Sequence, residues 1–220
     1  MSSISTDYQQ VITLIETEFD RNVRLYGDRM QCGSGCSSCC SQMFRITIMD
    51  AVMIARTMKQ LPVTEREDLQ ARAIQYLEER NRLIHQQTAE SNGENREVPT
   101  TGLRLPCPAL NEEGACRIYD TRPAVCRKWG IPLFDPQHPT ELQACELNFP
   151  PGTAFEDEEL DTLINQQTEI SERWQEIKAS VNDRYRTKQT STTIAEAIAG
   201  DYEEMVKQKL QKPTPYKRLE

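Results

Sequence analysis

The sequence has little histidine, few aromatic residues and a small share of large aliphatic side chains. Only 2 of the 220 residues are histidine and 6% are aromatic. Leu, Ile, Val and Phe account for 44 residues, a proportion at which a charged chain approaches the composition of disordered proteins. The scarcity of histidine argues against a hydrolytic zinc centre with an open position and against a Cys–His nucleophilic pair. We therefore expect something besides apolar burial to stabilise part of the fold.

Excess positive charge and long hydrophobic runs are also missing. A net charge of -8 and a pI near 5.0 disfavour binding to nucleic acid or to an anionic membrane. The first ten residues lack the basic and apolar regions of a secretory signal, and no stretch approaches the roughly 18 apolar residues of a membrane span. These absences predict a soluble protein of the cytoplasm or another reducing compartment, with neither nucleic acid nor membrane as a partner.

Cysteine, by contrast, is abundant, with eight residues in the chain. In a reducing compartment, so many thiols are typical of metal ligands or catalytic groups rather than of disulfides. An even number also fits disulfides, but Cys39 and Cys40 are adjacent, and a bond between them would need a strained ring. We take all eight as candidate metal ligands: Cys32, Cys36, Cys39, Cys40, Cys107, Cys116, Cys126 and Cys145.

The first four cysteines lie in the stretch CGSGCSSCC, residues 32–40. Such short spacings let a tight turn direct several sulfurs to one point, and Gly33 and Gly35 remove side chains that would obstruct it. Thiolates bind zinc in closed tetrahedral sites and also hold iron–sulfur clusters. Because consecutive side chains diverge, Cys39 and Cys40 suit two metal ions, or two atoms of one cluster, better than a single mononuclear site. We expect zinc in preference to an iron–sulfur cluster, and more than one metal ion.

Amphipathic helices are predicted on both sides of the cysteine-rich centre. Apolar residues at steps of three and four predict a helix over residues 7–26 that ends before Gly27. Four sequences resemble capping boxes that would begin further helices, at Thr47–Asp50, Thr64–Glu67, Thr153–Glu156 and Thr193–Glu196. The second and third predicted helices should form a helical hairpin, and the last should run to about Lys212. The polar residues 91–101 predict an exposed loop.

Residues 103–151 differ from both flanks, because they contain eight of the chain's twelve prolines and the other four cysteines. This segment cannot form a long helix. Gly114 indicates a short hairpin, and Thr121 the start of a short helix that carries Cys126. The predicted fold class is mainly α (α+β), with amphipathic helices around an irregular, metal-fastened centre and at most a short hairpin. We divide the chain into an N-terminal helix (1–31), a cysteine-cluster metal-binding domain with an inserted helical hairpin (32–151), and C-terminal helices that pack on it (152–220).

Side chains near the last cysteines suggest further roles. Arg122 and Arg127 either balance the charge of the thiolates or bind an acidic substrate, or else they pair structurally with Asp120 or a helix end. Tyr119 and Trp129 are expected to cover the cluster and limit the access of solvent. His138 is a minor candidate ligand, whereas His85 is expected to be a surface or packing residue.

The order of these motifs resembles a known family. Cys32-Gly-Ser-Gly-Cys36-Ser-Ser-Cys39-Cys40, then Cys107-Pro-Ala-Leu110, Gly114-Ala-Cys116, Arg122-Pro123-Ala-Val-Cys126-Arg127 and Cys145 are similar to the CxxCxxCC, or YkgJ-like, zinc- or iron-chelating family. The first spacing is Cys-x₃-Cys where the family name has Cys-x₂-Cys, which leaves the place of Cys32 in the ligand set open. The resemblance implies metal binding, and a related branch, the flagellin lysine N-methylases, is enzymatic and associated with an iron–sulfur centre.

Three functions follow from these observations. The first is a non-enzymatic metalloprotein, either a structural zinc module or a carrier. The second is an iron–sulfur enzyme or redox protein that modifies protein side chains, although no glycine-rich nucleotide loop supports a methyl-donor site. The third is an interaction scaffold whose acidic helices bind a protein partner while the metal is structural. Whether the protein is an enzyme stays open at this point.

Overall fold

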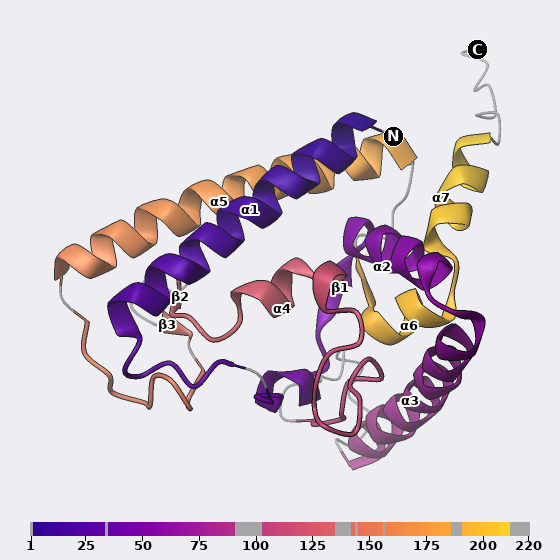
Figure 1. Ribbon diagram of the computed structural model, residues 1–220, viewed down its shortest axis with the longest axis horizontal. Coiled ribbons are helices and arrows are strands. Elements are labelled where there is room, and N and C mark those ends of the chain that lie inside the picture. Colours follow the sequence, from indigo (N-terminus) through magenta and orange to yellow (C-terminus); the bar gives the residue numbers. More distant parts are fainter. Residues whose placement is uncertain are drawn as a thin grey trace.

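The computed structural model describes residues 2–33, 35–90, 103–134, 142–143, 145–155, 157–185 and 191–211. Within these ranges the chain is mostly helical, with only four short strands, which confirms the predicted fold class (Figure 1). The predicted loop at 91–101 and the candidate ligand His138 lie outside the described residues. Among the helices described, none combines the length and apolar character that crossing a membrane requires.

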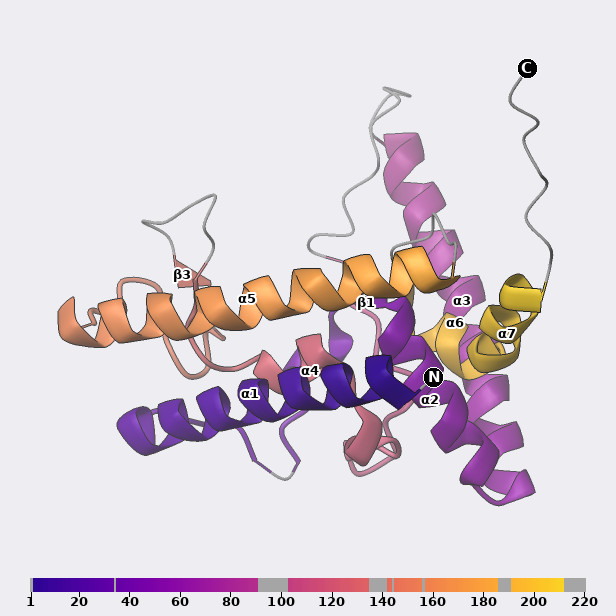
Figure 2. The ribbon, with the colours of Figure 1, turned by 90° about the horizontal axis from the view of Figure 1, so that it is seen from above.

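Two long helices, α1 (Ser2–Tyr26) and α5 (Asp157–Tyr185), lie side by side in opposite directions (Figures 1 and 2). α1 begins earlier than predicted but ends at Tyr26, directly before Gly27 as expected. Its apolar face is buried and joins one of two core clusters, which also includes residues of α2, α4, α5 and α7; the α1 members are Tyr8, Val11, Ile12 and Ile15. The periodicity of the sequence therefore identified the buried face correctly.

The helix α2 (Ile48–Gln60) begins at the predicted capping box. Thr47 Oγ1 accepts a hydrogen bond from the backbone of Asp50, and the Asp50 carboxylate accepts one from the Thr47 backbone. The same carboxylate, only 1% exposed, also accepts from the Tyr8 hydroxyl at 2.7 Å and from the Ala124 backbone at 3.1 Å. Asp50 thus joins α1 and α2 to the start of α4 (Ala124–Lys128), the short helix that carries Cys126.

Two of the predicted capping boxes are wrong. The helix α3 (Val63–Glu90) begins before Thr64, and its first turn is closed by a hydrogen bond from the Arg66 backbone to the Pro62 carbonyl. The Thr153 hydroxyl donates to the Pro150 carbonyl at 2.6 Å, and α5 begins only at Asp157. Thr64 lies inside α3, and Thr153 lies four residues before the first residue of α5, so neither threonine is the N-cap of its helix.

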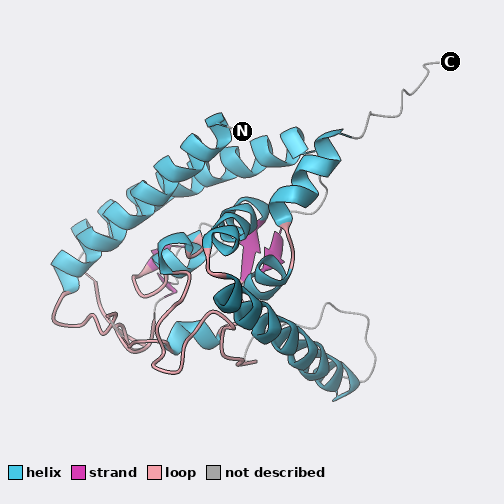
Figure 3. Cartoon of the chain, turned by 45° about the vertical axis from the view of Figure 1, so that its right-hand side comes forward, coloured by secondary structure: helices cyan, strands magenta, loops and turns pink. Residues whose placement is uncertain are grey.

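The C-terminal helix is two helices rather than one. The Thr193–Glu196 capping box is present and begins α6 (Ile194–Ala199), but this helix ends at Gly200. Asp201 then accepts a hydrogen bond from the Glu204 backbone at 3.0 Å and so begins α7 (Tyr202–Gln211). This division lets α6 pack against both α2 and α3, where its apolar residues join Ile54, Leu69 and Ala73 in a second core cluster. Figure 3 shows the few strands, in magenta, among the helices.

The strands are short and form two separate pairs. β1 (Arg45–Thr47) pairs antiparallel with β4 (Ser191–Thr193), with Ile46 opposite Thr192. β2 (Leu133–Phe134) and β3 (Leu142–Gln143) form the other pair. At Gly114, where the sequence predicts a hairpin, there is a turn with φ of 79° and a single bridge between Leu110 and Cys116. The β1–β4 ladder was not predicted, because its strands are far apart in the sequence.

Candidate metal centre

The first four cysteines lie on a compact turn after α1. Cys36 donates a backbone hydrogen bond to the Gly33 carbonyl, and Cys40 donates one to the Ser37 carbonyl within the 3-10 helix η1 (Ser38–Ser41). Gly35 has φ of 88°, a conformation that residues with a side chain rarely adopt. Gly35 is therefore required by the backbone of the turn. Space is not the reason, contrary to the expectation, since a Cβ at Gly33 or Gly35 would have no neighbouring heavy atom within 4 Å.

The second group of cysteines is brought to this turn by backbone pairing. Cys107 donates to the Cys40 carbonyl at 2.8 Å, and Leu105 donates to the Ser41 carbonyl at 2.9 Å. The bridge opposite Leu110 then positions Cys116, and α4 presents Cys126. α4 begins after Pro123, not at Thr121, which belongs to the separate 3-10 helix η2 (Tyr119–Thr121). The irregular segment thus folds back onto the turn that the first cysteines occupy.

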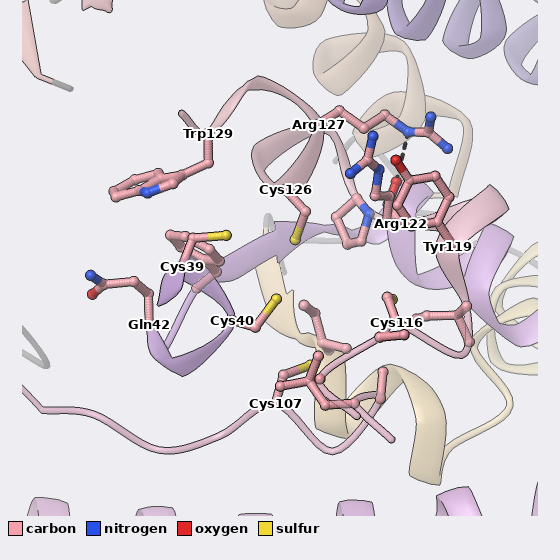
Figure 4. A pocket seen from close by; sticks show the side chains of 18 of the residues that line it. Cys39, Cys40, Gln42, Cys107, Cys116, Tyr119, Arg122, Cys126, Arg127 and Trp129 are labelled. Atoms are coloured by element: carbon pink, nitrogen blue, oxygen red, sulfur yellow. Dashed lines mark hydrogen bonds between the residues drawn. The ribbon is translucent and has the colours of Figure 1, made fainter. Parts of the chain in front are cut away.

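Seven of the eight predicted ligands line one cavity of about 480 Å³. In Figure 4 the sulfurs of Cys39 and Cys40, both on η1, and of Cys126, on α4, point into the space between these three side chains. The seven are Cys32, Cys36, Cys39, Cys40, Cys107, Cys116 and Cys126. Cys145 does not line the cavity, but its carbonyl accepts hydrogen bonds from the backbones of Asn148 and Phe149.

Asn148 is a functional candidate that the sequence did not indicate. Its side chain is buried, and Nδ2 donates to the Gly130 carbonyl at 2.7 Å and to Cys32 Sγ at 3.2 Å, while Oδ1 accepts from the Gln31 backbone. Gly130 has φ of 114°, and a Cβ there would lie 2.5 Å from Cys32 Sγ. Asn148 and Gly130 therefore form a socket for Cys32. The spacing Cys145-x-x-Asn148 offers no signal of this role, because the contacts join distant segments.

Burial and mutual proximity act on the thiols. Burial raises the pKa of Cys107 to about 12, and it raises the pKa values of Cys116 and Cys126 as well. The pKa of Cys39 is raised first by a hydrogen bond with Cys40 and then by burial. Removing these protons in the absence of a cation is unfavourable, whereas a metal ion stabilises the thiolates.

The charge interactions divide the cysteines into two overlapping groups. Besides burial, the pKa of Cys32 is raised by Cys36, Cys145 and Cys39, and it is lowered by the hydrogen bond from Asn148. Besides burial, the pKa of Cys126 is raised by three other cysteines, Cys107, Cys39 and Cys116. Cys39 belongs to both groups, since its charge acts on Cys32 and on Cys126.

The donor set fits a thiophilic metal, although the ligands are not preformed. Within the described ranges, no three His, Cys, Asp or Glu side chains already have the arrangement of a metal site. Seven thiols nevertheless face one cavity, and free cysteines are the expected ligands of zinc or of iron in a cluster. Binding would therefore require cysteine side chains to rotate toward a common point as their protons leave.

The two arginines near the cluster have different surroundings. Arg127 is buried, forms an ion pair with Glu16, and donates to the carbonyls of Arg122 at 2.9 Å and Asp120 at 2.5 Å. These contacts correspond to the structural alternative for Arg127. The Arg122 guanidinium lies instead 4.1 Å from the centroid of the Tyr119 ring, and both residues line the cavity.

Aromatic residues form part of the cavity wall. Trp129 lines it and packs against Phe44, with 4.9 Å between the ring centroids. Tyr119 also lines it but is 57% exposed, so it lies at the border with solvent. His85 is exposed on α3 and does not line the cavity, as expected for a surface residue.

The fold and site together define a helical protein with a cysteine-cluster centre. The chain matches the family model CxxCxxCC, described as "Putative zinc- or iron-chelating domain", over residues 31–146. Because this match covers more than half of the chain, the protein belongs to that family, which confirms the resemblance in the sequence. No curated protein and no solved structure matches the chain.

Proposed function

We propose that this protein is a non-enzymatic metalloprotein that binds zinc through its eight cysteines. The observation that carries the proposal is the convergence of seven cysteines, from segments far apart in the sequence, on one cavity. Eight thiolates supply the four ligands that each of two closed tetrahedral zinc sites needs, without sharing. Free thiols persist in a reducing environment, so we propose that the protein works in the cytoplasm or a similar compartment.

The two overlapping groups of cysteines support more than one metal ion. Cys32, Cys36 and Cys145 would contribute to one centre, and Cys107, Cys116 and Cys126 to the other. Cys39 and Cys40 lie next to each other on η1 and would complete the two sets, one cysteine for each. The socket around Cys32 supports its inclusion, which the unusual Cys-x₃-Cys spacing had left open.

An iron–sulfur cluster is the second candidate. A cavity of about 480 Å³ holds more than isolated zinc ions need, and the buried thiols and aromatic wall would shield a cluster from solvent. The same thiolates serve zinc and iron, since selectivity depends on geometry and on metal supply. In this case the function would be redox or enzymatic rather than structural.

Anaerobic purification followed by metal analysis and visible absorption spectroscopy separates the two. We expect a colourless protein with two zinc ions per chain. A brown protein that contains iron and acid-labile sulfide would instead support the iron–sulfur cluster. A single metal ion that needs only four of the eight cysteines would overturn the proposal of two centres. Single Cys→Ser variants assign the ligands, and Ser38→Ala, which alters a neighbouring residue of the same turn, serves as their control.

A further inference from the structure

Arg122 is a cavity-lining cation without an acceptor. Its Nε atom is fully buried and has no hydrogen-bond partner, and within the described part of the chain its guanidinium forms no ion pair. Arg127, on the same segment, is by contrast fully engaged by Glu16 and two carbonyls. A buried donor that is left unpaired is costly, and the cost is greater for a charged group. Nε itself has no surface that a ligand could reach, so a ligand in the cavity would bind the terminal N–H groups of Arg122, for which the described residues supply no acceptor.

The contact with Tyr119 leaves the binding edge of Arg122 available. The ring covers one face of the guanidinium, with 4.1 Å between the guanidinium carbon and the ring centroid. Stacking on an aromatic face leaves the N–H groups in the guanidinium plane free to donate to a planar acceptor. Two parallel hydrogen bonds from these groups match the two oxygens of a carboxylate. Figure 4 shows Arg122 and Tyr119 beside the cysteine cavity, with Trp129 on its opposite side.

The cavity has room and a suitable lining for the rest of such a ligand. Its volume of about 480 Å³ lies in the roughly 300–1,000 Å³ range of sites for small organic molecules. Apolar side chains also line it, among them Phe44, Trp129 and Ile118. Arg122 also acts on two of the thiols, because its charge opposes the rise in the pKa values of Cys39 and Cys116. The other thiolates would repel an anion, so the favourable position for a negative group is at Arg122.

We propose that the cavity binds a small organic carboxylate, with its carboxylate on Arg122 and its apolar body against the aromatic wall. The ligand would lie beside the metal centre, and its apolar body would face the bound metal. This inference goes beyond metal binding, since the recognition rests on Arg122 and not on the identity of the metal. It assigns the acidic-ligand role to Arg122 alone, because Arg127 is occupied by structural partners.

The test uses the full-length, metal-loaded protein and benzoate as the probe. We expect saturable one-site binding by calorimetry, with a change in tryptophan fluorescence. Arg122→Gln should weaken benzoate binding by roughly ten- to a hundredfold, the value of a charge-assisted hydrogen bond, and Arg122→Lys should weaken it less. Arg104→Gln is the matched control, since Arg104 is exposed, contacts the Ser38 carbonyl and does not line the cavity.

Metal content and circular dichroism of each variant accompany the titrations. Unchanged metal content with lost benzoate binding in Arg122→Gln supports the proposal. Equal benzoate binding by wild type and Arg122→Gln would overturn it. So would the absence of saturable binding to the wild type together with reduced metal content in Arg122→Gln, because Arg122 would then serve the thiolates themselves. Failure of the proposed metal function is distinct, since the wild type would then contain no bound metal.

Discussion

At the scale of single residues, the cysteines depend on neighbours that carry no metal-binding signal. Asn148 is 2% exposed, and its amide satisfies the Gly130 carbonyl and the Gln31 backbone while it donates to Cys32 Sγ. Groups that donate to a ligating atom fix its orientation and stabilise its charged form. The burial of Asn148 means that no water could replace these hydrogen bonds without rearrangement.

Replacing Asn148 by Asp should weaken zinc binding by roughly ten- to a hundredfold, the usual effect of losing a group that supports a ligand. The substitution keeps the size of the side chain and the acceptor for Gln31, but a carboxylate would face Cys32 Sγ where an N–H now donates. Competition with a chromogenic chelator measures the affinity. Asn81→Asp on the exposed surface of α3 is the control. Wild-type affinity in Asn148→Asp would contradict the socket.

Gly130 offers a second, independent test of the same socket. A methyl group at this position would lie 2.5 Å from Cys32 Sγ, and φ of 114° is unfavourable for alanine. Gly130→Ala should therefore lower both zinc affinity and the free energy of unfolding, the latter by about 1–3 kcal/mol. Gly33→Ala, where the added Cβ has no neighbour within 4 Å, should change stability much less. Urea unfolding of the two variants compares them directly, and equal losses would be inconsistent with the close approach at Gly130.

At the scale of elements, two capping boxes formed and two did not. Thr47 and Thr193 are the last residues of β1 and β4. The β1–β4 ladder therefore holds each threonine in the extended conformation that an N-cap requires. Thr64 and Thr153 do not end a strand, and the carbonyls of Pro62 and Pro150 accept hydrogen bonds in these two places. The four-residue pattern is thus not sufficient for a capping box, and the neighbouring structure decides.

Glu196 makes the second of these boxes dependent on pH. Burial by itself would raise the pKa of Glu196, but hydrogen bonds from Thr192 and Thr193 outweigh it, and the pKa is lowered. The stabilisation is therefore complete above the unfolded pKa of roughly 4.3 and is lost as the pH falls through the folded pKa. Glu196→Ala should cost about 1 kcal/mol at pH 7, a value kept small because Glu196 is partly exposed.

Urea unfolding at pH 7 and in mild acid checks this expectation. The difference between wild type and Glu196→Ala should shrink as the carboxylate becomes protonated. Glu67→Ala is the matched control, because Glu67 lies in the predicted box that did not form, and it should have a small effect at both pH values. If the loss of unfolding free energy in Glu196→Ala instead grew toward acidic pH, the lowered pKa of Glu196 would be contradicted.

At the scale of the whole molecule, the cysteine-rich segments are placed by packed helices but contain little core of their own. Two apolar clusters lie mainly in the helices, and Asp50 connects the first of them to α4. The segments that carry the cysteines are joined to one another mostly by turns and isolated backbone hydrogen bonds. Metal binding would fasten these segments, and a closed zinc site contributes on the order of 10 kcal/mol to folding.

Removing the metal with a strong chelator under reducing conditions should lower the thermal midpoint and expose the central segment to protease. We expect new cleavage between residues 103 and 134, with much less in α1, whose apolar face is buried against other helices. Mass spectrometry of the fragments locates the cuts, and restoring zinc should protect the segment again. An unchanged midpoint and cleavage pattern after complete removal would mean that the metal does not stabilise the fold.

The sequence by itself determined the eight thiols, the tight turn at residues 32–40, the buried faces of the helices and the family. These properties follow from local spacing and periodicity, which depend on few neighbouring residues. Only the tertiary structure decided the β1–β4 ladder, the division of the last helix at Gly200 and the different surroundings of Arg122 and Arg127. The socket of Asn148 belongs here as well, because its hydrogen bonds join segments that the sequence keeps far apart.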